Sequence, residues 1–388
     1  MHDFDYLTDK DVYFDAACQS LRPRPVIEAL NRYYTEHNSC GERVKYAWGR
    51  KTDDLVEQTR ERMLKYLKLK SRDYFVSFTL NTTYGINLLL NQFRPGQFKK
   101  VVTSNIEHNS PFLATIAFAR REKVPREVIV RRKDGSINLE KCDFTKALVV
   151  MNCASNIDGR KMLNIKEVVK AVHQAGGIII IDAAQALAHS SEILHKTEAD
   201  AICTSAHKMY GPSLGVMIVR RDLQKRLVTN FVGGGMVDDV TKEDFDLSAD
   251  GNPDHAYTRF ESGLQAWGEI IAFGEALKWL ESLSKSDKKQ FVENYTRLFD
   301  FLNSHPRIHL INQEANPTMS FYIEGLDSHL VGEALSDEGI MARTGYFCVH
   351  YYLDHVKHYP PLIRFSLGYH VRKSDIDKTI KTLERMLG

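Results

Sequence analysis

The sequence predicts an α/β protein built on a mainly parallel β-sheet that is buried between helices. Short apolar runs without alternation, such as the four isoleucines at 178–181, are typical of strands that are covered on both faces. Amphipathic segments alternate with these runs, as the helices of βαβ units do. The two runs at 178–181 and 201–204 lead into polar residues, and in an open α/β sheet the carboxyl edge is where ligands bind.

Composition places the chain among ordinary globular proteins and excludes several other classes. Its 388 residues are enough for two domains, and 43% hydrophobic with 26% charged residues are typical values. A net charge of +2 gives no reason to expect a nucleic-acid or membrane partner. No segment approaches the roughly 18 apolar residues of a spanning helix. The first residues are acidic and lack an apolar signal region, so we expect a cytoplasmic location. The six scattered cysteines form no CxxC pair, which favours reduced thiols over disulfides or a metal site.

The N-terminal part begins with an apolar strand at 11–17. Pro25 then opens a helix over 26–34, because proline suits the first helical turn. Residues 38–49 show no period and are expected to form an irregular loop, and apolar residues at helical spacing predict a helix over 54–69.

Strand and helix patterns then alternate through the middle of the chain. A polar turn at 79–85 separates the first strand and helix of this part, and Gly176 and Gly177 close the helix before the isoleucine run. Strands are predicted at 74–78, 100–103, 147–151, 178–181, 201–204 and 215–219, and helices at 86–90 and 164–174.

The C-terminal part combines the same two patterns. Residues 231–236 are expected to be flexible because they contain three glycines, and the acid-rich stretch 238–254 lacks apolar periodicity and is expected to be a mobile surface loop. Helices are predicted at 267–283, 291–302, 330–337 and 373–387, with strands at 318–323 and 362–368.

The polar residues after two of the strands suggest a cofactor. Asp182 and Gln185 follow the first strand, and Ser205, His207 and Lys208 follow the second. A lysine whose pKa is depressed can form a Schiff base, and an aspartate can keep a pyridinium nitrogen protonated. These are the requirements of pyridoxal 5'-phosphate. Spacing alone leaves open a helix-capping aspartate and a solvated lysine.

The motifs at 182–185 (Asp-Ala-Ala-Gln) and 205–212 (Ser-Ala-His-Lys-Met-Tyr-Gly-Pro) resemble those of class V, fold type I pyridoxal-phosphate enzymes, nearest to the cysteine desulfurase and selenocysteine lyase branch. The resemblance runs from about Tyr13 to the C-terminus. It implies a fold type I transferase, in which residues 16–265 form a large domain with a mainly parallel seven-stranded sheet. Residues 1–15 and 266–388 would form a smaller α/β domain, and the active protein would be a homodimer.

The resemblance also assigns residues to the cofactor. Thr82 and Thr83 match the phosphate-binding turn, His108 the histidine that stacks on the ring, and Asn156 the asparagine beside the ring oxygen and the substrate carboxylate. Each has a plainer alternative, namely a helix cap, a structural histidine and an Asx turn. The chain departs from the family pattern at Asn81 and Tyr84, and at Leu264-Gln265, where relatives have Thr-Pro. Gln265 is the candidate replacement for the phosphate contact across subunits.

The reaction is suggested by the segment Arg343-Thr-Gly-Tyr-Phe-Cys348, which resembles the part of desulfurases that ends in the catalytic cysteine. Arg364 matches the arginine that holds the amino-acid carboxylate, and Arg343 is a second candidate for substrate binding. The alternatives are a small buried cysteine and a surface arginine.

The resemblance implies that L-cysteine, and L-selenocysteine as a second candidate substrate, loses its sulfur to Cys348 as a persulfide. L-alanine remains, and a sulfur-acceptor protein or a thiol collects the sulfur. Lys208 would carry the cofactor and move the Cα proton. A class V aminotransferase, another lyase or epimerase of this class, and a non-catalytic binding protein of the same fold are the alternatives.

Overall fold

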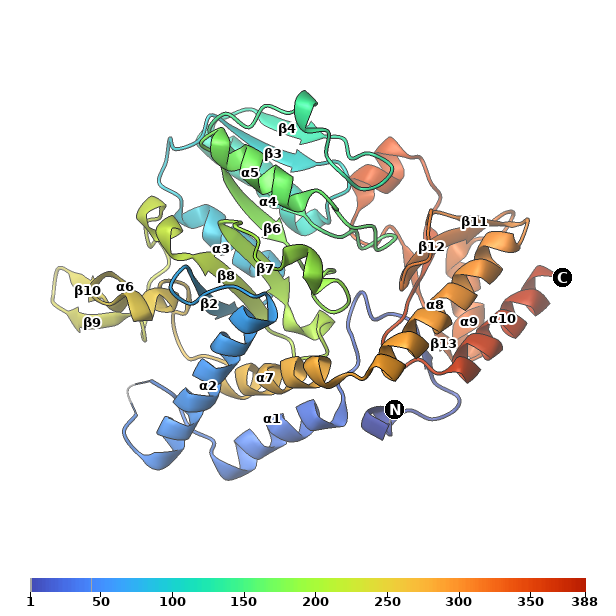
Figure 1. Cartoon of the computed structure of the whole chain (residues 1–388), viewed down its shortest axis with the longest axis horizontal. Coiled ribbons are helices and arrows are strands. Elements are labelled where there is room, and N and C mark those ends of the chain that lie inside the picture. The colour runs from blue at the N-terminus through green and yellow to red at the C-terminus, as the bar shows by residue number, and fades with distance from the viewer. Residues whose placement is uncertain (1, 43) are drawn as a thin grey trace.

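The computed structural model describes residues 2–42 and 44–388. Its larger sheet has seven strands in the order β2-β8-β7-β6-β5-β3-β4, and β8 alone among them runs antiparallel to its neighbours. The strands are β2 (Tyr74–Thr79), β3 (Lys100–Ser104), β4 (Arg126–Ile129), β5 (Ala147–Asn152), β6 (Ile178–Asp182), β7 (Ala201–Ser205) and β8 (Gly215–Arg220). The predicted mainly parallel seven-stranded sheet is therefore confirmed (Figure 1).

Alternate residues of the central strand β6 enter two separate apolar cores. Ile179 and Ile181 pack on the side of the sheet where the helices α2 (Ala47–Tyr66), α5 (Ile165–Gln174) and α7 (Trp267–Ser282) lie. Ile178 and Ile180 pack on the side of α3 (Thr82–Gln92) and α4 (Asn109–Glu122). Burial of both faces explains why this strand shows no alternation in the sequence.

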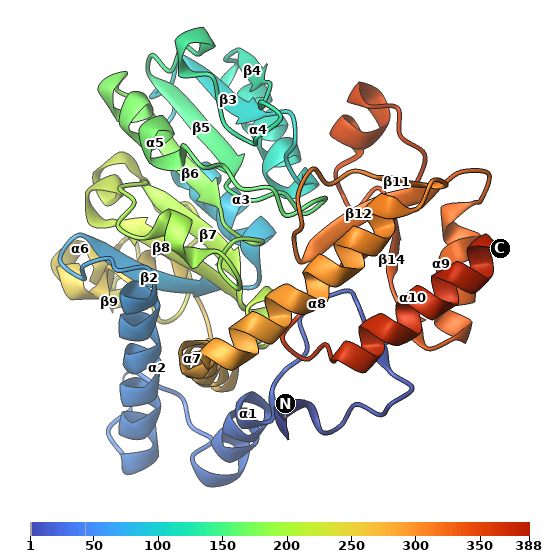
Figure 2. The ribbon, with the colours of Figure 1, turned by 45° about the vertical axis from the view of Figure 1, so that its right-hand side comes forward.

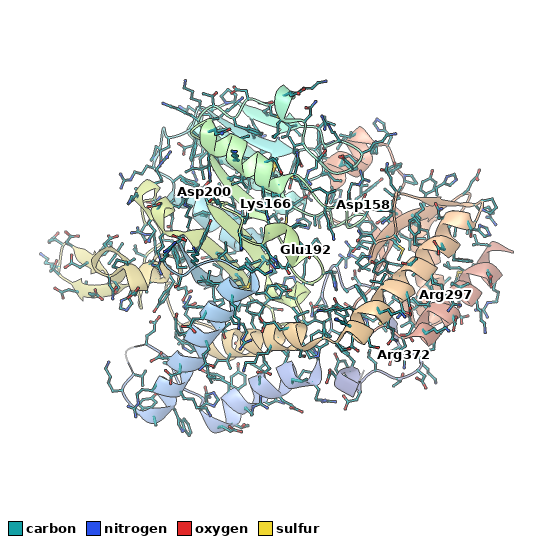
Figure 3. The ribbon with its side chains drawn as sticks, viewed as in Figure 1. Asp158, Lys166, Glu192, Asp200, Arg297 and Arg372 are labelled. Atoms are coloured by element: carbon teal, nitrogen blue, oxygen red, sulfur yellow. The ribbon has the colours of Figure 1, made fainter. Side chains whose placement is uncertain are left out.

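The second sheet is antiparallel, has the order β11-β12-β15-β14 and carries helices of its own (Figure 2). The short strand β1 pairs in parallel with β13, so the N-terminal segment joins the C-terminal part of the chain. Arg297 on α8 forms an ion pair with Asp377 on α10 (Figure 3). The elements are β1 (Val12–Tyr13), α8 (Lys285–Ser304), β11 (Ile308–Leu310), β12 (Thr318–Ile323), α9 (Ser328–Asp337), β13 (Ile340–Met341), β14 (Arg343–Gly345), β15 (Leu362–Ser366) and α10 (Lys373–Leu387).

Two expectations about loops are wrong. Helix α2 begins at Ala47, inside the segment 38–49 that was expected to be irregular. Its first turns are largely exposed and present no apolar stripe that a sequence pattern could detect. The stretch 238–254 contains regular structure: a projecting hairpin of β9 (Val237–Val240) and β10 (Phe245–Leu247), then α6 (Ser248–Gly251) and the start of a 3₁₀ segment, η6 (Pro253–Phe260) (Figure 1). The hairpin strands are largely exposed, so polar residues lie on both of their faces.

The remaining elements are α1 (Arg24–Glu36) and short 3₁₀ or π turns. These turns are η1 (His2–Phe4), η2 (Leu139–Lys141), η3 (Ser191–Leu194), η4 (Ala206–Lys208), η5 (Arg221–Arg226) and the π-helix η7 (Tyr351–Val356). Helices α1, α2 and α7 pack together below the large sheet (Figure 1). Within the described residues, no helix combines the length and the apolar character that crossing a lipid bilayer requires.

Candidate active site

A cavity of about 470 Å³ lies at the carboxyl ends of β5, β6 and β7, with β14 and β15 contributing part of its wall. The structure brings every sequence-predicted site residue to this cavity. They are Thr82, Thr83, His108, Asn156, Asp182, Gln185, Ser205, His207, Lys208, Arg343, Cys348 and Arg364. Their convergence from both ends of the chain is what a single reaction centre requires.

Lys208 follows β7 in the short turn η4, and its amine faces the carboxylate at the end of β6. Burial lowers the pKa of the Lys208 amine, and the Arg364 charge acts in the same direction, whereas Asp182 opposes them. Burial also raises the pKa of Asp182, which accepts a hydrogen bond from the backbone N–H of Ala184 (2.9 Å). A lysine with a depressed pKa is the form that attacks an aldehyde.

Hydroxyl groups gather where α3 begins. Thr82 and Ser205 are joined through their hydroxyls (2.6 Å), and the hydroxyls of Thr83 and Ser110 are 2.6 Å apart. Asn81 caps α3 by accepting a hydrogen bond from the N–H of Tyr84 (2.9 Å). The N–H groups of Thr82 and Tyr84 donate to Ser205 and Asn81, so the positive end of the α3 dipole and the adjacent hydroxyls are the features suited to a phosphate.

His108 stands at the start of α4 with a defined tautomer. Its Nδ1 accepts a hydrogen bond from the N–H of Ser110 (3.1 Å), which leaves the proton of the neutral ring on Nε2. Burial and the charges of Lys208 and Arg364 lower the pKa of His108 to about 3. The ring is therefore neutral at pH 7, and a neutral imidazole can lie flat against an aromatic cofactor.

Arg364 is buried, and a carboxylate that the sequence did not indicate holds it. Its guanidinium donates to Asp15 (2.9 Å) and to the backbone carbonyl of Asn156 (3.1 Å). Arg343, which pairs with Arg364 across β14 and β15, lies 3.9 Å from the other oxygen of Asp15. Asp15 therefore positions both arginines. In the sequence, Asp15 lies inside the strand predicted at 11–17, and no pattern there indicates this role.

Cys348 is exposed on a short segment whose backbone is fixed. Phe347 and Cys348 both have positive φ angles, 48° and 58°, which non-glycine residues rarely adopt. The Phe347 carbonyl accepts from the side-chain amide of Asn156 (2.8 Å), and the Cys348 carbonyl accepts from the N–H of Asn109 (2.7 Å). These hydrogen bonds hold the thiol at the wall of the cavity that contains Lys208.

Three polar atoms of the cavity are buried without a hydrogen-bond partner: Oδ1 of Asn152, Oδ1 of Asn156 and Nε of Arg364. Buried polar groups are normally paired, so these atoms indicate groups that a ligand satisfies. With the Lys208 amine, the Asp182 carboxylate and the hydroxyls at α3, they fit a phosphorylated aromatic aldehyde that carries an amino acid. Asn152 was not predicted from the sequence.

Two glutamines named in the sequence analysis also make local hydrogen bonds. The side-chain amide of Gln185 donates to the carbonyl of Ala17 (2.8 Å), so this residue supports the segment next to Asp15 as well as the cavity wall. The amide of Gln265 donates to the carbonyl of Gly263 (3.2 Å), and its expected contact with the phosphate of the other subunit stays a prediction. In the part of the chain that the structure describes, no three His, Cys, Asp or Glu side chains gather as metal ligands.

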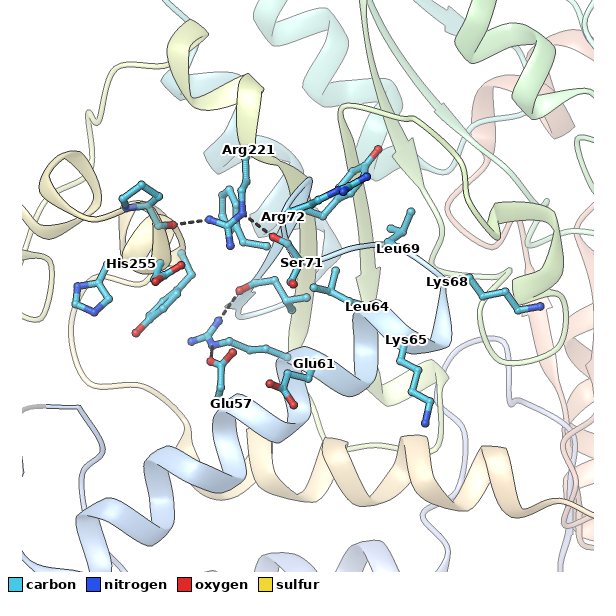
Figure 4. Close-up of a pocket in the computed structure, with 17 residues that line it drawn as sticks. Glu57, Glu61, Leu64, Lys65, Lys68, Leu69, Ser71, Arg72, Arg221 and His255 are labelled. Atoms are coloured by element: carbon cyan, nitrogen blue, oxygen red, sulfur yellow. Dashed lines mark hydrogen bonds and ion pairs between the residues drawn. The ribbon is translucent and has the colours of Figure 1, made fainter.

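A larger groove of about 1,120 Å³ lies between α2 and η6, away from this cavity (Figure 4). Two of its three arginines, Arg60 and Arg221, make structural contacts, whereas Arg72 is exposed. Arg60 forms a buried ion pair with Glu261 (2.6 Å), and Arg221 donates to the carbonyl of Ser71 (2.7 Å). Glu261 also accepts from the N–H of Phe78 on the edge strand β2 (2.7 Å). These contacts attach α2 and Glu261 to the edge strand β2.

The fold and the cavity together define a pyridoxal-phosphate-dependent enzyme of fold type I. The Aminotransferase class-V family model matches residues 12–379, and the chain belongs to that family. A probable cysteine desulfurase of Pyrococcus abyssi is 27% identical over 98% of this chain and 94% of its own length. A cysteine desulfurase of Pectobacterium atrosepticum is 25% identical over 96% of this chain and 92% of its own length.

Solved structures agree on the fold. The apo cysteine desulfurase of Thermococcus onnurineus superposes with a TM-score of 0.87 at 24% identity, covering 98% of this chain and 96% of its own. The Escherichia coli cysteine desulfurase CsdA, in an S-sulfonic acid form, superposes with a TM-score of 0.88 at 21% identity. The match covers 100% of this chain and 97% of that chain.

Proposed function

We propose that this protein is a cysteine desulfurase that converts L-cysteine to L-alanine and keeps the sulfur as a persulfide on Cys348. The observation that carries the proposal is that an exposed thiol, Cys348, lines the same cavity as the buried amine Lys208. The curated relatives at 25% and 27% identity, which bear the name of this activity, support it.

The side chains divide the binding of substrate and cofactor between them. The free Nε of Arg364, with Arg343 nearby, holds the carboxylate of the amino acid. Asp182 keeps a proton on the ring nitrogen, and the hydroxyls of Thr82 and Ser205 bind the phosphate. When bound, pyridoxal phosphate supplies an electron sink for the charge that develops at Cα.

Lys208 and Cys348 carry out the proton and sulfur transfers. The Lys208 amine removes the Cα proton and later returns a proton to the carbon skeleton. The Cys348 thiolate attacks the sulfur of the substrate, so a sulfur–sulfur bond forms as the carbon–sulfur bond breaks. The electron pair of the broken bond stays with the carbon that becomes the methyl group of alanine, and a proton completes that group. The step is redox-neutral overall, because the two sulfurs are oxidised to the persulfide level while the carbon that becomes the methyl group is reduced by the same two electrons.

The deciding experiment incubates the purified holoenzyme with L-cysteine and no keto acid. We expect alanine to form and the peptide that contains Cys348 to gain one sulfur atom by mass spectrometry. Cys348→Ser should abolish both products while the visible absorbance of the bound cofactor remains. Alanine production by Cys348→Ser at the rate of the unchanged enzyme would refute the proposal, and amino transfer that depends on a keto acid would indicate an aminotransferase.

Further parts of the proposal rest on the family resemblance. We propose that the enzyme acts as a homodimer, that L-selenocysteine is a second substrate and that a protein or small thiol accepts the sulfur. Residues 16–265 would form the large domain, and residues 1–15 with 266–388 the small one. A chemistry that needs a reduced thiol at Cys348 suits the cytoplasm.

A further inference from the structure

The cavity contains a second exposed thiol for which the reaction above has no use. Cys18 and Cys348 are both exposed and both line the cavity. The other four cysteines lie elsewhere: Cys153 and Cys203 are buried, and neither Cys40 nor Cys142 lines the cavity.

The segment that carries Cys18 is built into the site by both halves of the molecule. The N–H of Ala17 donates to the hydroxyl of Ser366 (2.9 Å) on β15, and its carbonyl accepts from the amide of Gln185 (2.8 Å) after β6. The N–H of Cys18 donates to the carbonyl of Asp15 (3.0 Å). Ala17 and Gln185 line the cavity themselves, and Asp15 holds Arg364 there. Cys18 is thus held in a fixed position.

Both thiols lie in the same positive field. The Lys208 amine interacts electrostatically with both Cys18 and Cys348. The buried guanidinium of Arg364 interacts in the same way with Cys18. Arg364 also has an unpaired Nε in this cavity, as Asn156 has an unpaired Oδ1, so the space between the elements is built for a ligand. The two thiols therefore share one cavity wall with these two cations.

The Cys348 segment is held on both sides, by Asn156 and by Asn109. Movement of the Cys348 thiol away from the cavity would break these two hydrogen bonds. A second thiol on the wall offers a path for the sulfur that needs no such motion.

We propose that Cys18 is the first acceptor of the sulfur that Cys348 takes from the substrate, an inference that rests on the proposed desulfurase function. The Cys18 thiolate attacks the outer sulfur of the Cys348 persulfide. A new sulfur–sulfur bond forms at Cys18 as the one at Cys348 breaks, and Cys348 leaves as a thiolate that is ready for the next substrate. The proton stays on the transferred sulfur, and no oxidant or reductant is needed.

A first experiment tests whether the two thiols can meet. The purified holoenzyme, without substrate, is treated with a mild thiol oxidant and digested without reduction. We expect a Cys18–Cys348 linked peptide in the unchanged enzyme and in Cys142→Ser, a matched control at a cysteine outside the cavity. Cys18→Ser should not form the link. Its absence from the unchanged enzyme would overturn the inference without touching the proposed function.

A second experiment follows the sulfur. After a limiting pulse of L-cysteine, mass spectrometry locates the added sulfur on the Cys18 or the Cys348 peptide. We expect both peptides to gain sulfur in the unchanged enzyme and in Cys142→Ser. Cys18→Ser should hold sulfur on Cys348 alone and release it to an external thiol on the order of tenfold more slowly, because a neighbouring thiol is lost.

The outcomes separate the two ideas. Sulfur on neither peptide in any variant would refute the proposed function itself. Sulfur on Cys348 and never on Cys18, with release from Cys18→Ser as fast as from the unchanged enzyme, would refute only the relay. Sulfur on Cys18 in Cys348→Ser would also refute it, because the proposed order requires Cys348 to be loaded first.

Discussion

Arg364 shows how one side chain can be both secured and available. Two of its nitrogens are engaged by Asp15 and by the backbone of Asn156, and its Nε remains buried and unpaired. A guanidinium presents several donors in a fixed plane, so two can anchor it while another meets a carboxylate. Lysine has no such division of donors.

Arg364→Lys should therefore raise the KM for L-cysteine by on the order of tenfold to a hundredfold, because it loses the planar geometry. Arg343→Lys, at the neighbouring and exposed position, should raise KM by less. Steady-state kinetics of both variants would measure the difference, with cofactor absorbance as the control for an intact site. Equal effects at the two positions would mean that Arg364 is not the principal carboxylate ligand.

Most of the candidate site could be predicted because its residues follow strands within recognisable motifs. Lys208 and Asp182 are examples, since each lies within a few residues of a strand end. Asp15, Cys18 and Asn152 could not be assigned in this way. Asp15 reaches Arg364 and Cys18 reaches the cavity because β1 pairs with β13 and Asp15 bridges Ser366 on β15, and such long-range pairing leaves no local pattern. The role of Asn152 follows from an unpaired atom, which only coordinates reveal.

At the scale of elements, the start of α3 links helix stability to cofactor binding. Asn81 caps the helix, and Thr82 and Thr83 follow it. We expect Asn81→Ala to lower the free energy of unfolding by about 1 kcal/mol, the usual cost of a lost N-cap. It should also weaken cofactor binding severalfold, because the first turn of α3 is less well held. Urea denaturation and cofactor titration would measure the two effects.

Asp327 provides the matched control for this prediction. It caps α9 by accepting hydrogen bonds from the N–H groups of His329 (2.8 Å) and Leu330 (3.1 Å), away from the cavity. Asp327→Ala should lower stability by a similar amount and leave cofactor affinity unchanged. If both variants weakened the cofactor equally, the effect would be one of global stability and α3 would have no special role.

The elements that could be predicted are those whose burial leaves a period in the sequence. Strand β12 and helix α10 begin and end where predicted, and both have a strongly buried side. Helix α4 and strand β4 were not predicted. Alanine and arginine residues interrupt the apolar pattern of α4, and β4 is short and only partly buried. The hairpin of β9 and β10 is stabilised by pairing between exposed strands, which apolar periodicity cannot report.

At the scale of the whole molecule, aromatic and histidine side chains fill the junction between the two sheets. His189 follows β6, stacks on Phe291 of α8 (4.9 Å between centroids) and contacts Tyr369 after β15. His370 donates through Nε2 to the carbonyl of Tyr13 (2.8 Å) and packs against Phe4. The junction therefore depends on rings that carry no charge.

This junction predicts how stability responds to acid. Burial lowers the pKa of His189 to about 4, and it also lowers the pKa of His370 to about 4. The ordinary pKa of histidine is near 6.5. Below pH 6.5 these two histidines bind protons in the unfolded chain but stay neutral in the folded chain. The free energy of unfolding therefore falls as the pH drops toward 4. Nearby Lys161 opposes protonation of His189, as Arg372 does at His370, whereas Asp375 and the Tyr13 carbonyl favour a charged His370.

We expect each of these two histidines to lower the free energy of unfolding by about 2 kcal/mol between pH 7.5 and pH 5, from the linkage between pKa and stability. Urea denaturation at both pH values would measure the loss, which should shrink in the double variant His189→Gln with His370→Gln. His305→Gln, at a histidine outside the junction, is the matched control and should keep the full dependence. An unchanged acid sensitivity in the double variant would show that other groups, such as carboxylates in buried ion pairs, govern the response.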